Sequence, residues 1–144
     1  MKKIDPVKST ISLCSKYYTD KTFKHCVRVA EYAYENPMVI DSDIFRNAIY
    51  LIALCHDLLE DTDVTIEEIK DATRLDEKLV VDTMNLLTKR DNETYVEYIK
   101  KLRDSKNPCA YIVKIADMKD HLQQTETLTE KLKEKYWEAL PYLL

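Results

Sequence analysis

The 144-residue chain contains no glycine, and this absence limits its possible folds more than any other feature of the sequence. Glycine provides the close backbone approaches and left-handed turns on which the common phosphate-binding loops depend. Walker-type loops and the Rossmann fingerprint are therefore excluded as a means of binding nucleotides. A chain without glycine instead fits a fold made of helices joined by polar turns.

The composition predicts a single globular domain over residues 1–144. Hydrophobic residues make up 45% of the chain and charged residues 33%, and the length suits one core. No apolar run is long enough to cross a bilayer and no signal-peptide pattern opens the sequence, so no membrane partner is expected. With a net charge of -4 and no basic stripe, general nucleic-acid binding is not expected either.

The four cysteines predict a reducing compartment. They are Cys14, Cys26, Cys55 and Cys109. None forms a CxxC pair and each has apolar neighbours, so buried thiols in a cytoplasmic protein are expected rather than disulfides or a zinc knuckle. The sequence leaves the oligomeric state open.

The spacing of apolar residues predicts an all-α bundle of about six to eight helices. The expected helices cover residues 6–18, 22–35, a segment ending near 56, a short segment after 65, and residues 76–88, 93–104, 108–122 and 129–141. Thr65 and Glu68 form a capping-box pattern at the start of the short helix. No repeat or linker divides the chain.

The stretch YLIALCHDLLEDTDVTIEEI, residues 50–69, ends an apolar helix on ionisable side chains. His56 and Asp57 close the apolar run, and Glu60 and Asp61 follow four residues later. Burying charge costs free energy unless the charges are paired or bind a metal. If the helix continued, the second pair would lie on the same face as the first. An acid close to a metal can orient an attacking water and accept its proton.

Two further residues offer ligands of the same kind. His25 lies midway along an amphipathic helix, and Asp117 follows the apolar run of residues 112–116. With His56 and Asp57 they would provide two imidazoles and two carboxylates, which suit Mn²⁺, Fe²⁺ or Zn²⁺. Taken singly, each also has an ordinary structural explanation, such as a core histidine or a carboxylate paired with a lysine.

The order H…HD…D, with the longer string HDLLED, resembles the HD-domain metal-dependent phosphohydrolases. The strings ALCHDLLEDTDVTIEEI, LLTKR and VKIADMKDHL are together similar to the hydrolase domain of RelA/SpoT-type proteins. That branch includes small stand-alone hydrolases of guanosine tetraphosphate. The resemblance extends from about Lys21 to Leu122, which is most of the chain.

The resemblance implies an all-helical fold that binds one divalent metal, usually manganese. The implied metal ligands are His25, His56, Asp57 and Asp117. Glu60 and Asp61 would position or activate the attacking water. The implied reaction removes pyrophosphate from the 3′ position of a guanosine 5′-di- or triphosphate, which converts guanosine tetraphosphate to GDP.

The sequence departs from this branch on the helix that carries Asp117. That helix usually reads ADRLHN, whereas Met118 and His121 occupy the arginine and asparagine positions here. His121 lies four residues after Asp117. It is expected either to face the cleft, where it would contact the substrate or act as an acid toward the leaving group, or to stabilise the helix C-terminus as a cation.

A second departure precedes His25, where the branch has a basic loop that contains glycine. The segment YYTDKTFKH is shorter and has none. Four basic residues are still candidates for phosphate contacts. They are Lys21 and Lys24 in this segment, and Lys89 and Arg90 on the turn after LLT.

Three interpretations of the site follow. The first is hydrolysis of guanosine tetraphosphate. The second is an HD-domain nucleotidase or nucleotide pyrophosphatase with a different substrate, because a fold does not fix a function. The third, suggested by Met118 and His121, is a nucleotide-binding module without catalysis, although all four ligand positions and both acids are present.

Overall fold

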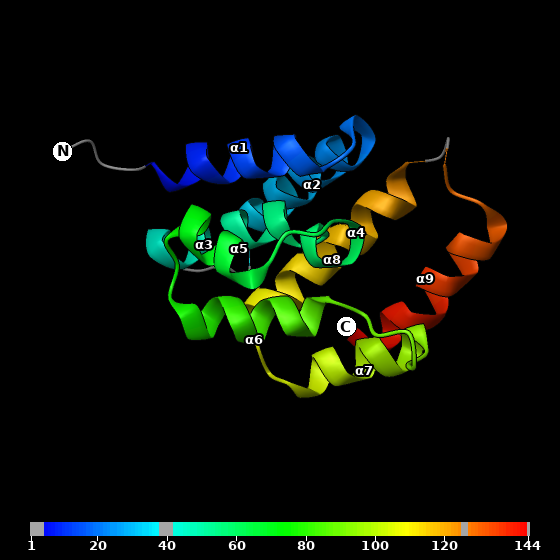
Figure 1. The fold of residues 1–144 in the computed structure, drawn as a ribbon. Coiled ribbons are helices and arrows are strands. Elements are labelled where there is room, and N and C mark those ends of the chain that lie inside the picture. Colours follow the sequence, from blue (N-terminus) through cyan, green and yellow to red (C-terminus); the bar gives the residue numbers. More distant parts are fainter. Residues whose placement is uncertain (1–4, 38–41, 125–126, 144) are drawn as a thin grey trace.

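The chain is all-α in the computed structural model, as predicted (Figure 1). The structure describes residues 5–37, 42–124 and 127–143. Its helices are α1 (Pro6–Tyr17), α2 (Asp20–Glu35), α3 (Asp43–Cys55), α4 (Leu58–Asp61), α5 (Ile66–Thr73), α6 (Glu77–Leu87), α7 (Tyr95–Asp104), α8 (Pro108–Gln123) and α9 (Glu130–Leu143). All but the four-residue α4 have at least eight residues. Over these described segments, no helix combines the length and the hydropathy needed to span a membrane.

Helices α2, α3 and α8 pack against one another at the centre of the molecule. Helix α1 lies along one side, while α6 and α7 lie along the opposite side and α9 packs on α7 and α8 (Figure 1). A continuous hydrophobic core reaches from Cys14 of α1 to Leu143 of α9. The first and last helices therefore share the core of the central three.

Side-chain caps mark most helix starts. The capping residues are Asp5, Thr19, Ser42, Thr65, Asp76, Thr94 and Asn107, each accepting a hydrogen bond from a backbone N–H of the following turn. The predicted capping box of Thr65 and Glu68 is confirmed. Because the chain has no glycine, Arg74 (φ 58°) and Lys106 (φ 55°) adopt the left-handed backbone conformation, which costs about 1–2 kcal/mol of conformational free energy each.

The helix carrying the apolar run does not continue through His56 and Asp57. Helix α3 ends at Cys55, and α4 begins at Leu58. Tyr18 explains the break, because its hydroxyl donates to the carbonyl of Leu54 (2.9 Å) and accepts from the N–H of Asp57 (3.2 Å). These bonds replace helical ones, so the two ligand candidates lie at a turn.

The last helix is longer than predicted. The sequence placed its end at Pro141, yet α9 continues to Leu143. A proline only removes the hydrogen bond of its own N–H and disturbs the preceding turn. Burial of Leu143, whose side chain is 2% exposed, explains why the final turn stays helical.

Candidate metal centre

The central helices bring the four predicted metal ligands together. His25 comes from the middle of α2, His56 and Asp57 from the turn between α3 and α4, and Asp117 from α8. Three of them are buried, with fractional exposures of 8% for His25, 3% for His56 and 4% for Asp117, whereas Asp57 is partly exposed. Helices α2 and α8 and the turn between α3 and α4 thus bring polar side chains to one largely buried place.

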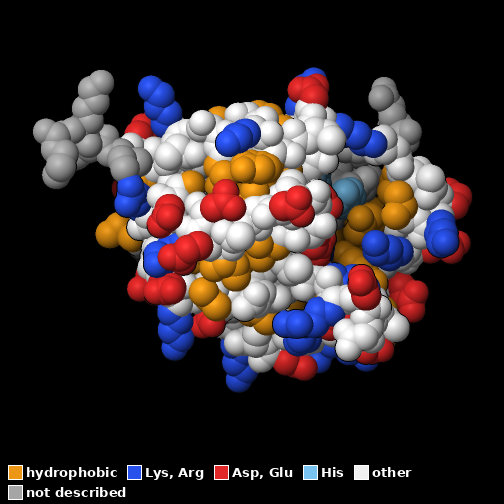
Figure 2. Space-filling model, viewed as in Figure 1, with side chains coloured by type: hydrophobic (Ala, Val, Ile, Leu, Met, Phe, Trp, Pro, Cys, Tyr) orange, Lys and Arg blue, Asp and Glu red, His pale blue; other side chains and the backbone are white. Residues whose placement is uncertain are grey.

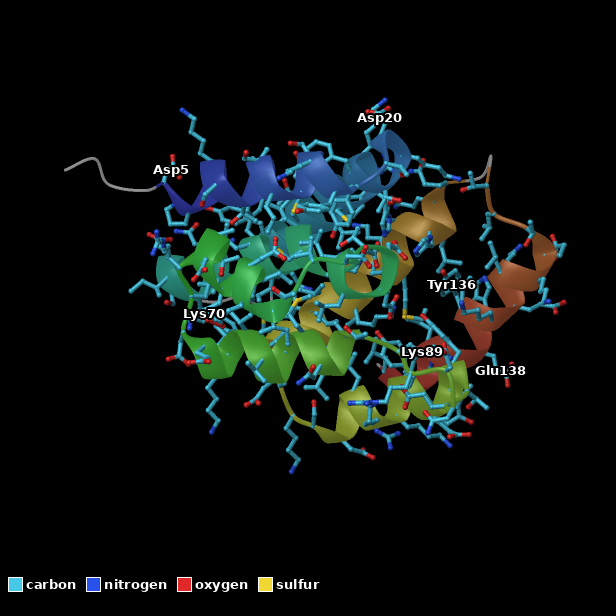
Figure 3. All side chains as sticks on the ribbon, viewed as in Figure 1. Asp5, Asp20, Lys70, Lys89, Tyr136 and Glu138 are labelled. Atoms are coloured by element: carbon cyan, nitrogen blue, oxygen red, sulfur yellow. The ribbon has the colours of Figure 1, made fainter. Side chains whose placement is uncertain are left out.

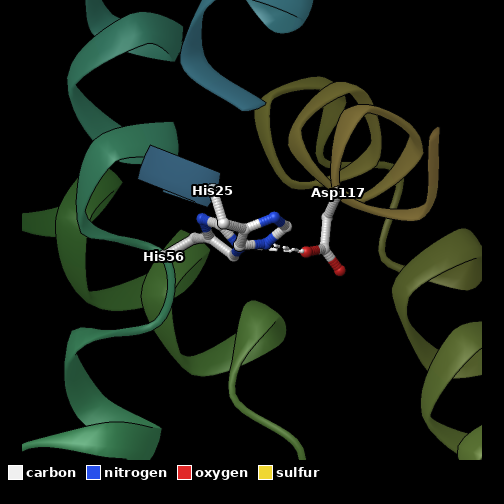
Figure 4. A group of neighbouring side chains, drawn as sticks. All are labelled: His25, His56 and Asp117. Carbon is white, nitrogen blue, oxygen red and sulfur yellow. Dashed lines mark hydrogen bonds and ion pairs between the residues drawn. The ribbon is translucent and has the colours of Figure 1, made fainter. Parts of the chain in front are cut away.

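The two imidazoles meet at the carboxylate of Asp117 (Figure 4). Its Oδ1 lies 2.9 Å from His25 Nε2 and 3.1 Å from His56 Nε2. The Asp57 carboxylate approaches the same nitrogens, at 3.7 Å from His25 and 3.4 Å from His56. One ligand atom each of His25, His56 and Asp117 lies within 4.8 Å of the others. This donor set fits a divalent ion such as Mn²⁺, Fe²⁺ or Zn²⁺.

The outer nitrogens of both imidazoles are held by acceptors. His25 Nδ1 lies 2.6 Å from Asp120 Oδ2, and Arg28 Nε donates to the other oxygen of Asp120 at 2.7 Å. His56 Nδ1 lies 2.6 Å from the carbonyl oxygen of Ala53. Protons on the two Nδ1 atoms leave both Nε2 lone pairs facing the centre, as metal ligation requires. Sequence analysis missed Asp120, although its spacing of three from Asp117 on one helix was a usable signal.

A lysine is buried beside the centre. Lys114 Nζ lies 2.7 Å from Asp117 Oδ2 and over the rings of Tyr95 (5.4 Å) and Tyr98 (5.1 Å). Burial disfavours the charged forms of Lys114 and Asp117, but the attraction between the two charges outweighs this effect. This attraction holds the pKa of Asp117 well below its usual value and raises the pKa of Lys114. The ion pair of Lys114 and Asp117 therefore places a positive charge beside the candidate ligands.

A cleft of about 130 Å³, which we term the α8–α9 cleft, opens from the centre. It is lined by Asp57, Glu60, Lys89, Tyr95, Tyr98, Lys114, Asp117, His121, Lys135 and Tyr136. Figure 2 shows a hollow on this face with a histidine, acidic side chains and lysine or arginine side chains around it. Cationic and acidic groups thus surround the opening.

The two predicted acids lie on α4. Glu60 lines the α8–α9 cleft, and its Oε1 accepts a hydrogen bond from the backbone N–H of Lys89 at 2.6 Å. The surrounding protein displaces water and raises the pKa of Glu60, although the Lys89 N–H opposes this shift. Asp61 is largely exposed. The nearby protein still removes part of the water around its carboxyl group, and this desolvation together with repulsion by Asp57 raises the pKa of Asp61.

His121 stands on the wall of the cleft. Its Nε2 lies 3.3 Å from Asp117 Oδ1, and its ring stacks on Tyr136 of α9 with a centroid distance of 5.1 Å and an interplanar angle of 11°. Figure 3 shows Tyr136 between α9 and α8, and Glu138 on the outer side of α9. The orientation of His121 fits the first expectation, a residue that faces the cleft. Sequence analysis did not single out Tyr136 or Lys135 among the many tyrosines and lysines.

The other basic candidates are distributed over two further clefts. Lys21 and Lys24 line a cleft of about 390 Å³ between α2 and α8, the α2–α8 cleft, which also includes His25 and His121. Lys24 pairs there with Asp20 at 3.1 Å. Arg90 lines a separate cleft between α6 and α7. Lys89, by contrast, borders the α8–α9 cleft.

Comparison with known families gives one match. The family model described as the HD domain matches residues 22–122. The matched range contains the four ligand candidates, Glu60, Asp61 and His121, and it ends before α9. A comparison with curated protein sequences found no match.

Proposed function

Because the chain belongs to the HD-domain family, we propose that it hydrolyses a phosphate ester or anhydride of a nucleotide, with guanosine tetraphosphate as the leading substrate. HD-domain proteins are metal-dependent phosphohydrolases, so the chain is an enzyme of that class. The observation that carries the proposal is the convergence of two imidazoles and two carboxylates beside a cleft that lysines line. The RelA/SpoT resemblance supplies the choice of substrate.

In this proposal His25, His56, Asp57 and Asp117 hold one divalent metal, with Mn²⁺ as the expected ion. Its borderline-hard character suits mixed nitrogen and oxygen donors. When bound, such an ion supplies Lewis-acid chemistry, since it neutralises phosphoryl charge and makes water more acidic. Asp120 and the Ala53 carbonyl keep the two imidazoles in the tautomer that this requires.

Side chains of the protein would accept the proton of the attacking water and neutralise the charge of the phosphate oxygens. Glu60 stands at the cleft beside Asp57, and its raised pKa brings it closer to the proton affinity that a general base needs near neutral pH. We propose that it orients the attacking water and accepts its proton, with Asp61 assisting. Lys89 and Lys135 border the same cleft and would neutralise phosphate oxygens.

His121 borders both the α8–α9 cleft and the α2–α8 cleft. We propose that His121 contacts a substrate that extends from one cleft into the other. Lys21 and Lys24 would then meet the part of the nucleotide that extends into the α2–α8 cleft. Arg90, on its separate cleft, is given no substrate contact in this arrangement.

One observation favours the second candidate function, a different nucleotide substrate. Met118, at the position where the RelA/SpoT branch has arginine, is fully buried in the core. A contact made by that arginine would therefore be absent here. The metal centre is unaffected by this change, so it supports hydrolysis while leaving the base and phosphate pattern to other residues.

We also propose that residues 1–144 form one domain in a reducing, cytoplasmic setting. Helices α1 and α9 lie outside the matched range, yet Cys14 and Tyr136 belong to the same core as the central helices. All four cysteines are buried free thiols, which supports the reducing compartment.

Hydrolysis with Mn²⁺ tests the proposed function directly. Purified protein is offered guanosine tetraphosphate beside other nucleotides, and the products are resolved by anion-exchange chromatography. We expect GDP and pyrophosphate from the tetraphosphate. Turnover of other nucleotides alone would favour the second candidate, and no turnover of any of them would contradict both.

Replacing Asp120 by asparagine is expected to weaken Mn²⁺ binding by about 10–100-fold, measured by calorimetry. The change removes the negative charge that orients His25 and pairs with Arg28. Asp20→Asn is the matched control, because Asp20 is an exposed partner of Lys24 on the same helix as His25. Equal affinities for the two variants would contradict the positioning role of Asp120.

A further inference from the structure

The cysteine that follows His25 lies against the metal centre. Cys26 is fully buried on α2, and its Sγ lies 3.7 Å from Asp57 Oδ2. One ligand atom each of Cys26, His56 and Asp57 lies within 4.8 Å of the other two. These residues form a second group of metal-ligating side chains, which shares His56 with the group of His25, His56 and Asp117 and shares both His56 and Asp57 with the four proposed ligands of the hydrolytic centre.

Two separations in this second group, each to a different oxygen of Asp57, are close to those expected around a tetrahedral ion. Zinc–sulfur and zinc–oxygen distances of about 2.3 Å and 2.1 Å place the two ligand atoms about 3.6 Å apart. Cys26 Sγ and Asp57 Oδ2 are 3.7 Å apart. Nitrogen and oxygen ligands would similarly be about 3.4 Å apart, and His56 Nε2 lies 3.4 Å from the other oxygen of Asp57.

The two groups cannot be occupied at the same time. The Nδ1 atom of His56 lies 2.6 Å from the Ala53 carbonyl oxygen, so only Nε2 has a free lone pair. One lone pair binds one ion. A soft thiolate favours zinc-like ions, whereas Mn²⁺ favours oxygen and nitrogen donors. The identity of the ion therefore decides which group is used.

We propose that Cys26, His56 and Asp57 form an alternative site for thiophilic divalent ions such as Zn²⁺ and Cd²⁺, and that such an ion excludes Mn²⁺ from the hydrolytic centre. The second half rests on the proposed function, because the displaced ion is the Mn²⁺ of that centre. Cys26 binds as the thiolate, and its proton passes to solvent. The thiol thus makes the enzyme sensitive to thiophilic ions.

Titration with Co²⁺, a coloured substitute for Zn²⁺, tests sulfur ligation without any substrate. Its visible bands report binding, and a near-ultraviolet thiolate-to-cobalt charge-transfer band reports a sulfur ligand. We expect this band in the unmodified protein and its loss in Cys26→Ser. Cys109→Ser is the control and should keep the band, because this buried thiol lies about 12 Å along α8 from Asp117.

Bound Co²⁺ without the charge-transfer band in the unmodified protein would overturn the inference and leave the metal centre intact. Absence of any bound Co²⁺ would count against the centre as well. Retention of the band in Cys26→Ser would assign the sulfur to another cysteine, which also overturns the inference. Circular dichroism checks folding, and Cys26→Ala is the second variant if serine is not tolerated at this buried position.

Competition between ions tests the exclusion. Free Mn²⁺ is followed by electron paramagnetic resonance while Cd²⁺ is added to the Mn²⁺-loaded protein. We expect one equivalent of Cd²⁺ to release the bound Mn²⁺, and Cys26→Ser to need at least about tenfold more Cd²⁺. Simultaneous binding of both ions would overturn the shared use of His56.

Discussion

Replacing Asp117 by alanine is expected to abolish both Mn²⁺ binding and hydrolysis. Its Oδ1 is the atom at which His25 Nε2 and His56 Nε2 meet, at 2.9 Å and 3.1 Å. The same carboxylate neutralises the buried Lys114 through Oδ2 at 2.7 Å. Removing it therefore deletes a proposed ligand and leaves an unpaired cation next to the ion's position.

Loss of fold must be separated from loss of metal in this experiment. Breaking a buried ion pair by deleting one partner costs about 3–5 kcal/mol, so Asp117→Ala is expected to lower the free energy of unfolding as well. Lys114 can be replaced too, and Asp117→Ala with Lys114→Met removes both charges at once. We expect the double variant to regain part of the stability and none of the metal binding.

The measurement is thermal unfolding with and without Mn²⁺, together with calorimetry for the ion. An ion that binds only the folded chain raises the melting temperature, and this shift should vanish in Asp117→Ala. Asp104→Ala is the control, because Asp104 is an exposed residue of α7 paired with Arg103. A normal Mn²⁺-dependent shift in Asp117→Ala would show that Asp117 is no ligand.

The helix starts could be predicted because they depend on neighbouring residues. Thr65 and Glu68 cap α5 from three residues apart, and both lie within one short stretch of sequence. The end of the helix near His56 was predicted, and α3 ends at Cys55. The contact made there by the hydroxyl of Tyr18 could not be predicted, because Tyr18 lies 36 residues before Leu54. The local pattern indicated where the apolar helix ends, whereas the tertiary contact at that end depends on a residue from another part of the chain.

The same distinction applies to the site. Imidazoles and carboxylates that end apolar runs are unusual enough to be noticed, so His56, Asp57 and Asp117 stood out. The spacing of Asp120 from Asp117 was a local signal, but the partner that gives Asp120 its role, His25, lies 95 residues away. Tyr136 reaches the site from α9 by packing of that helix on α8, and nothing in its local sequence distinguishes it from other tyrosines.

Replacing Glu60 by glutamine is expected to retain Mn²⁺ binding and to lower kcat by about 10²–10⁴-fold. Glutamine keeps an oxygen that can accept the Lys89 N–H, now at 2.6 Å from Glu60 Oε1, so the cleft wall should hold its shape. What is lost is the ability to accept a proton. Because Glu60 lies outside the four converging ligands, the metal should bind normally.

Measuring both kcat and metal affinity in this variant separates a role of Glu60 in proton transfer from a role in supporting the metal centre. A change in both would mean that Glu60 supports the centre, and a change in neither would remove it from the proton transfer and point to Asp61. Glu138→Gln is the control, since Glu138 is exposed on the outer side of α9 (Figure 3). Burial and the nearby carboxylate of Asp57 raise the pKa of Glu60, although the Lys89 N–H and the Lys114 cation oppose the shift. A residue so placed at the cleft, with unchanged metal and lost turnover, would be the group that activates the water.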